Sequence, residues 1–284
     1  MIPRPFRSLH PAVRDDIADL VTRRPLPGRS LSDHNPFLFL NHHGPQVYPS
    51  GNQGLPFGPH PHRGFETVTF ILEGSLAHHD SGGHESIIGA GGVQWMTAGR
   101  GLTHAELSPD AFKQSGGPLE ILQLWVNLPA RLKMTAPRYV GLQADEIPQF
   151  ETEDGQARVA LIAGAAFGRQ GGIPTLTDIT MMTIHAAADG RIDLPVTRGR
   201  RVFLYVVRGR VRNADGGILP AHHLAVMEDD AGDGVSLVAE EASVLLLGHA
   251  EPLGEPIASH GPFVMNTQAE IRQAVLDYQA GLFA

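Results

Sequence analysis

This sequence of 284 residues lacks cysteine, a run of basic residues and a long apolar segment. The absence of cysteine excludes disulfide bonds, thiolate metal sites, iron–sulfur clusters and a cysteine nucleophile. There are 22 Lys and Arg against 30 Asp and Glu, so the formal charge is −8 and direct binding of DNA or RNA is not expected. No apolar stretch approaches the ~20 residues of a membrane helix, and no signal-peptide pattern follows the first residues. We therefore expect a cytoplasmic protein that does not enter a membrane.

Glycine and proline, by contrast, are abundant. The 33 Gly and 22 Pro make 55 of 284 residues, or about 19% against a usual ~12%. Because both residues interrupt helices and mark turns, this composition favours an all-β chain. Short apolar runs between turn residues point the same way. They predict strands at residues 36–48, 67–72, 93–96, 119–128, 158–163, 176–185, 202–207, 224–227 and 242–247.

The strand pattern occurs twice, and the chain is long enough for about two domains. The two occurrences flank a polar, proline-containing stretch, residues 129–157, which we interpret as a connection. We predict two related β-barrels, at residues 1–135 and 136–284. Near the end, Thr267 and Glu270 fit a capping box, and apolar residues then recur at helical spacing. This predicts a short C-terminal helix within the second domain.

Two short motifs carry metal-ligand chemistry: His60 with His62, and His104 with Glu106. On a strand, residues i and i+2 point to the same face, so each motif can present two ligands to one point. If the two strands face each other inside a barrel, three imidazoles and one carboxylate converge. This donor set suits Fe, Mn, Ni, Cu or Zn and leaves coordination positions open. In a chain with 15 histidines a single His-x-His also arises by chance, so the surrounding sequence is needed to decide.

Both motifs belong to longer patterns. The first pattern consists of Gly54, His60, His62, Glu66 and Gly74, and the second of Gly99, Gly101 and His104. They resemble the two cupin motifs, with a final spacer in the first that is one residue longer than usual and with Gly99 where proline is usual. Longer blocks lie at residues 33–37, 60–69, 93–101, 123–129 and 261–267. With these blocks the sequence resembles the pirin family, whose members contain two cupin domains.

The resemblance implies two cupin (jelly-roll β-barrel) domains, with one metal in the N-terminal domain and none in the C-terminal domain. It implies that the ion is held by His60, His62, His104 and Glu106. Iron is the first expectation, with Mn, Ni, Cu or Zn as alternatives. Glu66 is a ligand in many other cupins; here we expect it behind the ligands, where it would orient the ring of His60 or His62.

The resemblance also implies a quercetin 2,3-dioxygenase-like oxidoreductase that opens the ring of quercetin or a related flavonol with O2. Glu106 is the candidate base for the substrate proton, and Glu66 is the fallback. A non-catalytic alternative stays open: a metal- or redox-dependent regulatory protein that binds a protein partner. An isomerase of sugars or small acids is a weaker alternative, because the site offers only Arg100 to an anionic substrate.

Three further expectations concern residues near these motifs. Trp95 and Met96 are expected either in the wall of an apolar pocket or in the core. Residues 78–84, which include three histidines, are expected in an exposed hairpin loop or, alternatively, at the rim of the substrate entrance. Arg63 is expected to point away from the face that carries His62 and to pair with an acid.

Overall fold

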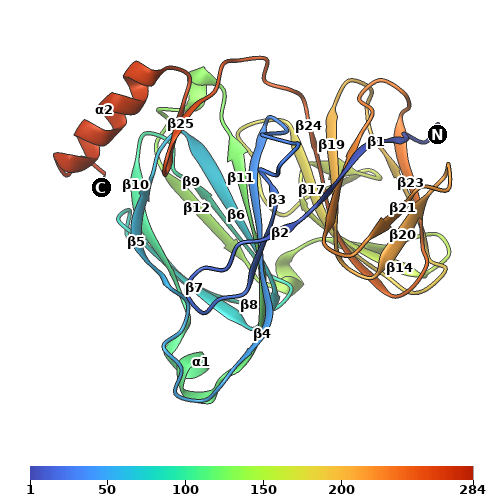
Figure 1. The fold of residues 1–284 in the computed structure, drawn as a ribbon, viewed down its shortest axis with the longest axis horizontal. Helices are drawn as coiled ribbons and strands as arrows, with labels where there is room; N and C mark the ends of the chain where they lie inside the picture. Colours follow the sequence, from blue (N-terminus) through green and yellow to red (C-terminus); the bar gives the residue numbers. More distant parts are fainter. Residues whose placement is uncertain (284) are drawn as a thin grey trace. The chain divides into compact units, whose positions relative to one another are not determined.

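The computed structural model describes residues 1–283, which form mainly β-strands (Figure 1). Helices are few: α1 (Asp110–Ser115), α2 (Gln268–Gln279) and two short 3-10 helices (Ala130–Leu132 and Ala144–Glu146). The predicted all-β class is therefore confirmed. Among the described residues, no helix has the length and apolar character that a membrane crossing requires.

The strands are short and numerous. The first twelve are β1 (Phe6–Pro11), β2 (Val13–Arg14), β3 (Thr22–Leu26), β4 (Phe37–Tyr48), β5 (Phe57–His62), β6 (Phe65–Glu73), β7 (Ser75–Asp80), β8 (Glu85–Gly89), β9 (Val93–Thr97), β10 (Leu102–Leu107), β11 (Gly117–Asn127) and β12 (Arg138–Leu142). The others are β13 (Gln149–Glu151), β14 (Ala157–Ala163), β15 (Ala165–Ala166), β16 (Arg169–Gln170), β17 (Ile179–Ala186), β18 (Arg191–Pro195), β19 (Arg201–Arg208), β20 (Arg210–Asn213), β21 (Ile218–Pro220), β22 (His223–Met227), β23 (Gly234–Ala239), β24 (Ser243–Ala250), β25 (Ala258–His260) and β26 (Phe263–Met265). Each of the predicted strands is present.

The chain forms two compact units. The first unit consists of Arg14–Arg23, Asn35–Asp145 and Leu253–Ala284, and the second of Met1–Val13, Arg24–His34 and Glu146–Pro252. This division differs from the expected boundary at residue 135. The N-terminal strand β1 belongs to the second unit, and the C-terminal helix α2 belongs to the first. Strand β1 pairs with β22 of the second unit, and helix α2 contacts β25 and β26 of the first (Figure 1). Local sequence patterns predict the strand and the helix but not the partners on which they pack.

Both units repeat one strand order. The first unit has a seven-stranded sheet, β12-β9-β6-β11-β4-β3-β2, and a four-stranded sheet, β5-β10-β7-β8. The second has β1-β22-β19-β24-β17-β14-β13 and β18-β23-β20-β21. Strands β2–β11 thus correspond in order to β13, β14 and β17–β24, and only the edge strands β12 and β1 come from different places in the chain. The prediction of two related barrels is confirmed. The expected connection at residues 129–157 contains β12, which extends the first sheet beside β9.

Inward-facing residues fill the two units differently. In the second unit, inward apolar side chains of both sheets form one large core, in which β18 contributes Ile192 and Leu194, and β23 contributes Val235 and Leu237. In the first unit, a smaller apolar cluster that includes Ile71 occupies part of the interior. Strands β5 and β10, the counterparts of β18 and β23, carry the histidine motifs of the first unit.

The C-terminal helix is fixed to the first unit by polar contacts. The predicted capping box is confirmed: the Thr267 hydroxyl accepts from the backbone N–H of Glu270, and the Glu270 carboxylate accepts from that of Thr267. Further along the helix, Asp277 accepts a hydrogen bond from Nη1 of Arg63 at 2.6 Å. The Arg63 guanidinium also lies 4.5 Å from the centre of the Phe283 ring. Arg63 therefore pairs with an acid, as predicted from the sequence.

The segment before this helix packs against the backbone that follows His62. A Cβ at Gly64, where φ is +88°, would lie 1.9 Å from the carbonyl oxygen of Val264. The buried Lys133 joins the same segments: its Nζ donates to the carbonyls of Gly64 (2.9 Å) and Val264 (3.0 Å) and to Oδ1 of Asn127 (2.6 Å). Burial lowers the pKa of Lys133 to about 8. Close approach and a positive φ both require glycine at position 64.

We predict that Gly64→Ala lowers the free energy of unfolding by about 2 kcal/mol or more, because the new Cβ adds a clash to an unfavourable backbone conformation. Gly58→Ala is the matched control in β5, since nothing lies within 4 Å of its Cβ position. The measurement is thermal unfolding followed by circular dichroism. Equal melting temperatures for the two variants would contradict this account of the close approach.

Candidate metal centre

Three histidines converge inside the first unit. Strands β5 and β10 pair antiparallel, and the register places His60 opposite His104. Ring centres lie 4.4 Å apart for His60 and His104, 4.9 Å for His60 and His62, and 5.0 Å for His62 and His104. One nitrogen from each ring lies within 4.8 Å of the other two. We call these residues the histidine triad.

The other ring nitrogens show which atoms are available to a metal. Nδ1 of His60 lies 2.8 Å from the carbonyl oxygen of Gly58, and Nδ1 of His62 lies 3.4 Å from that of Pro262. A carbonyl accepts a hydrogen bond, so Nδ1 carries the proton and Nε2 keeps its lone pair in the neutral ring. Both ring nitrogens of His104 are buried, with no hydrogen-bond partner among the described residues. A buried polar atom without a partner is costly, and a bound cation would satisfy one of them.

The electrostatics favour the neutral form of His62 and His104. Burial, with smaller contributions from neighbouring histidines, lowers the pKa of His104 well below its usual value. Burial and His60 lower the pKa of His62 to about 3. Metal ligation requires the neutral imidazole, so these rings need not lose a proton to bind an ion near pH 7. The residues present therefore fit a divalent transition metal.

Glu106 lies on the next inward position of β10, but its carboxylate is held by other groups. Oε1 accepts a hydrogen bond from the hydroxyl of Thr69 at 2.7 Å, and Oε2 accepts one from the amide of Gln123. The cluster of potential metal ligands consists of the three histidines. The structure thus brings three of the four predicted ligands together and leaves Glu106 beside them, bonded to β6 and β11.

Glu66 faces away from the triad. Phe65, Thr67 and Thr69 lie on one face of β6, because side chains two residues apart on a strand point the same way. Glu66 lies between them in sequence and therefore points to the opposite face of the sheet. There its Oε1 accepts from the hydroxyl of Thr97 at 2.6 Å, and burial raises its pKa. The structure does not show the expected contact of Glu66 with His60 or His62.

Aromatic side chains line the triad on one side. The ring of Trp125 lies 5.3 Å from that of His62, 4.5 Å from that of Phe65 and 4.7 Å from that of Phe39. Its indole N–H is buried without a hydrogen-bond partner among residues 1–283. Trp95 and Met96, which were expected either in a pocket wall or in the core, are both buried in the core, where Met96 packs in a small apolar cluster with Tyr139. Gln123 and Trp125 are two residues apart on β11, so they lie on the same face of the strand. This spacing is the sequence signal that points to both as site residues.

A second group of polar residues adjoins His104. The ring of His78 lies 5.5 Å from that of His104, stacks on Tyr139 at 4.0 Å and bonds to Asp80 at 2.8 Å. His78 and Asp80 are buried on β7, so the expected exposed loop is wrong for these two residues; the turn begins after Asp80. A cavity of about 210 Å³ adjoins β5, β7 and β10, lined by Pro59, His79, Asp80, Ser81, Thr103, His104 and Ala105.

Comparison with known proteins identifies the family. A family model described as Pirin matches residues 19–126, and one described as the Pirin C-terminal cupin domain matches residues 181–284. The human protein named pirin is 39% identical over 266 residues, which cover 90% of this chain and 86% of the human protein. This chain belongs to the pirin family. The predicted fold class, with two cupin domains in one chain, is thereby confirmed.

Two further proteins are similar to this chain over most of its length. A pirin-like protein of Caulobacter vibrioides is 43% identical over 230 residues, 80% of each chain. A crystal structure of quercetin 2,3-dioxygenase from Acinetobacter baumannii has a TM-score of 0.90 and 34% identity, and the match covers 99% of both chains. The similarity therefore extends over both cupin domains of this pirin-family chain.

We predict that His104→Ala abolishes metal retention. Loss of a residue that merely orients a ligand lowers metal affinity about 10- to 100-fold, so loss of the ligand itself should cost about 100-fold or more. After anaerobic loading with Fe(II) and desalting, mass spectrometry of metal content should find about one equivalent in the wild type and under a tenth of that in the variant. His84→Ala is the control, because His84 is half-exposed and bonds to Asp80 outside the triad. Equal metal content in all three proteins would refute the assignment.

Proposed function

We propose that this pirin-family chain is a metal-dependent dioxygenase that opens the ring of quercetin or a related flavonol with O2. The observation that carries the proposal is the histidine triad, in which His62 and His104 are buried, beside an aromatic wall. The name of the Acinetobacter relative, quercetin 2,3-dioxygenase, supports the choice of substrate. We propose His60, His62 and His104 as metal ligands, with Glu106 as the fourth, and iron as the metal.

Bound metal would supply a Lewis acid that favours the ionised 3-hydroxyl of the flavonol and a redox centre for O2. The chain's own residues do the rest. The rings of Phe39, Phe65 and Trp125 offer apolar surface to a flat aromatic substrate. The indole N–H of Trp125, which has no partner, can donate to a substrate oxygen. In the reaction both oxygen atoms of O2 enter the ring-opened product, and one ring carbon leaves as carbon monoxide.

A base has to take the proton of the 3-hydroxyl. Glu106 suits this role better than Glu66, because Glu106 lies on the strand that carries His104 while Glu66 lies on the opposite face of its sheet. The hydrogen bonds from Thr69 and Gln123 hold the Glu106 carboxylate beside the triad. The proton passes to Glu106 and returns to the ring-opened product, so the carboxylate ends the cycle ionised.

We predict that metal-loaded wild type bleaches quercetin absorbance with equimolar uptake of O2, and that His62→Ala does not. Glu106→Gln should lower the rate about 100-fold or more, since general base catalysis contributes about 10²–10⁴-fold. Both rates are measured spectrophotometrically, with an oxygen electrode in parallel.

His84→Ala serves as the control and should retain the wild-type rate within a factor of two. Bleaching by His62→Ala at the wild-type rate would sink the proposal. A wild type that holds metal but takes up no O2 with flavonols would instead favour the non-catalytic, partner-binding alternative.

A further inference from the structure

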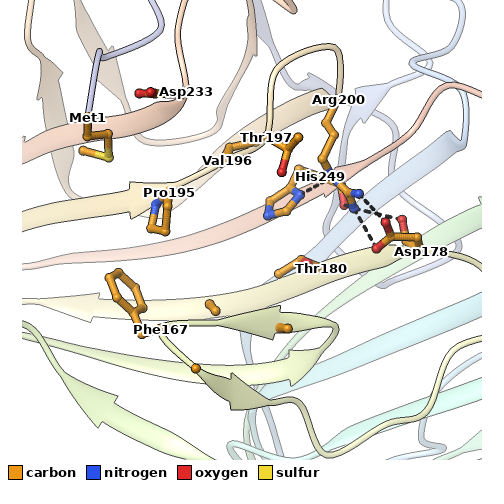
Figure 2. A pocket seen from close by; sticks show the side chains of 13 residues that line it. Met1, Phe167, Asp178, Thr180, Pro195, Val196, Thr197, Arg200, Asp233 and His249 are labelled. Carbon is orange, nitrogen blue, oxygen red and sulfur yellow. Dashed lines mark hydrogen bonds and ion pairs between the residues drawn. The ribbon is translucent and has the colours of Figure 1, made fainter.

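The second unit contains a cavity of about 590 Å³ (Figure 2). Polar side chains that line it include Asp178, Thr180, Arg200 and His249, and Phe167, among others, supplies apolar surface. The volume lies within the ~300–1,000 Å³ range of small-molecule sites. Every residue that lines it belongs to the second unit.

The cavity lies at one end of the barrel interior. Thr180 and His249 are directly opposite each other on β17 and β24. They continue the inward faces that deeper in the barrel carry Met182 and Leu247 of the apolar core. Pro195, at the end of β18, also lines the cavity. Strand β18 corresponds to β5 of the first unit, which ends at His62. The cavity therefore lies at the end of the second barrel that corresponds to the triad-bearing end of the first barrel.

His249 presents a hydrogen-bond donor to this space. Its Nδ1 lies 2.8 Å from Nε of Arg200, which can only donate, so Nδ1 accepts. Burial and the charge of Arg200 lower the pKa of His249 to about 3, so the ring is neutral and carries its proton on Nε2. His249 (6% exposed) and Thr180 (3% exposed) are buried and line the cavity, and the ring hydrogen bond of His249 is made by Nδ1, on the other side of the ring from Nε2. Figure 2 shows Nε2 on the side of Pro195 and Phe167.

The charged side chains that line the cavity are Asp178, Arg200 and Asp233, which sum to −1. Arg200 is already paired: its Nη1 lies 2.6 Å from Oδ2 of Asp178, and its Nη2 donates to the backbone oxygen of Asp178 at 2.9 Å. A second carboxylate, Asp233, also lines the space. A carboxylate ligand would compete with Asp178 for Arg200 and face Asp233, so an uncharged oxygen acceptor is the better match for His249 and Thr180.

Phe167 supplies an aromatic surface at the rim. It forms, with Gly168, the two-residue turn between β15 and β16, and its φ is +51°. Positive φ at both Phe167 and Gly168 (+70°) is what such a two-residue hairpin turn requires, so the turn itself accounts for this conformation. The ring is 50% exposed and contacts Phe150 edge-on, with ring centres 5.1 Å apart.

We propose that this cavity binds an uncharged aromatic carbonyl compound. Its carbonyl oxygen accepts hydrogen bonds from Nε2 of His249 and from the hydroxyl of Thr180, and its ring packs against Phe167. The site is a second ligand site of this chain, built in the barrel whose inward positions on β18 and β23 are apolar.

Isothermal titration calorimetry of the full, metal-loaded chain tests this, with chromone as the probe. Chroman, which lacks the carbonyl, and chromone-2-carboxylate should each bind at least about 10-fold more weakly. Thr180→Val and Phe167→Gly should each weaken chromone binding about 5-fold or more. Valine matches threonine in shape and glycine tolerates a positive φ, so both variants should keep the fold. Thr183→Val, on the opposite face of β17, is the control and should bind as the wild type does.

The proposal is overturned if chromone does not bind, if chroman binds as well as chromone, or if Thr180→Val and Phe167→Gly both bind chromone with wild-type affinity. It is also overturned if His104→Ala abolishes chromone binding while Thr180→Val leaves it unchanged, because the compound would then occupy the first unit. Weakening in Thr180→Val and Phe167→Gly, with His104→Ala unaffected, supports it.

Discussion

The antiparallel pairing of β5 with β10 sets His60 opposite His104 and is the constraint on which the site depends. A shift of one residue in this register would turn the inward histidines outward. Because the pairing lies inside a barrel, His62 and His104 are removed from water, and burial lowers the pKa of both rings and favours their neutral form. Geometry and protonation state, the two requirements of a metal ligand, thus come from one structural feature.

The residues that follow β5 pack against the C-terminal segment of the chain. Gly64, two residues after His62, lies against the backbone of Val264, and Lys133 donates to the carbonyls of both residues. Arg63 binds Asp277 of helix α2. The histidine strand therefore owes its position to residues 200 and more away in sequence. This arrangement explains why the C-terminal segment belongs to the first unit although it follows the second barrel along the chain.

Much of the fold is readable from the sequence, because turn residues and apolar alternation are local signals. The two histidine motifs are readable for the same reason, since period two puts His60 and His62 on one face. Contacts between segments far apart in sequence leave no such signal. The sequence therefore does not predict that β1 belongs to the second unit and α2 to the first. Nor were the hydrogen bonds that hold Glu106, because Thr69 and Gln123 approach from two other strands. Glu66 illustrates a related limit: a motif match assigns a residue to a family position, but strand alternation decides which face it occupies.

X-ray absorption at the iron edge of the Fe(II)-loaded protein tests the central claim most directly, because imidazole rings give a characteristic multiple-scattering pattern. The account predicts a fit with three imidazole nitrogens at about 2.0–2.2 Å, completed by oxygen ligands. His104→Ala, reconstituted at excess iron, should show two imidazoles or none. A wild-type spectrum without imidazole scattering, or one that His104→Ala leaves unchanged, would contradict the assignment of the histidine triad as the metal site.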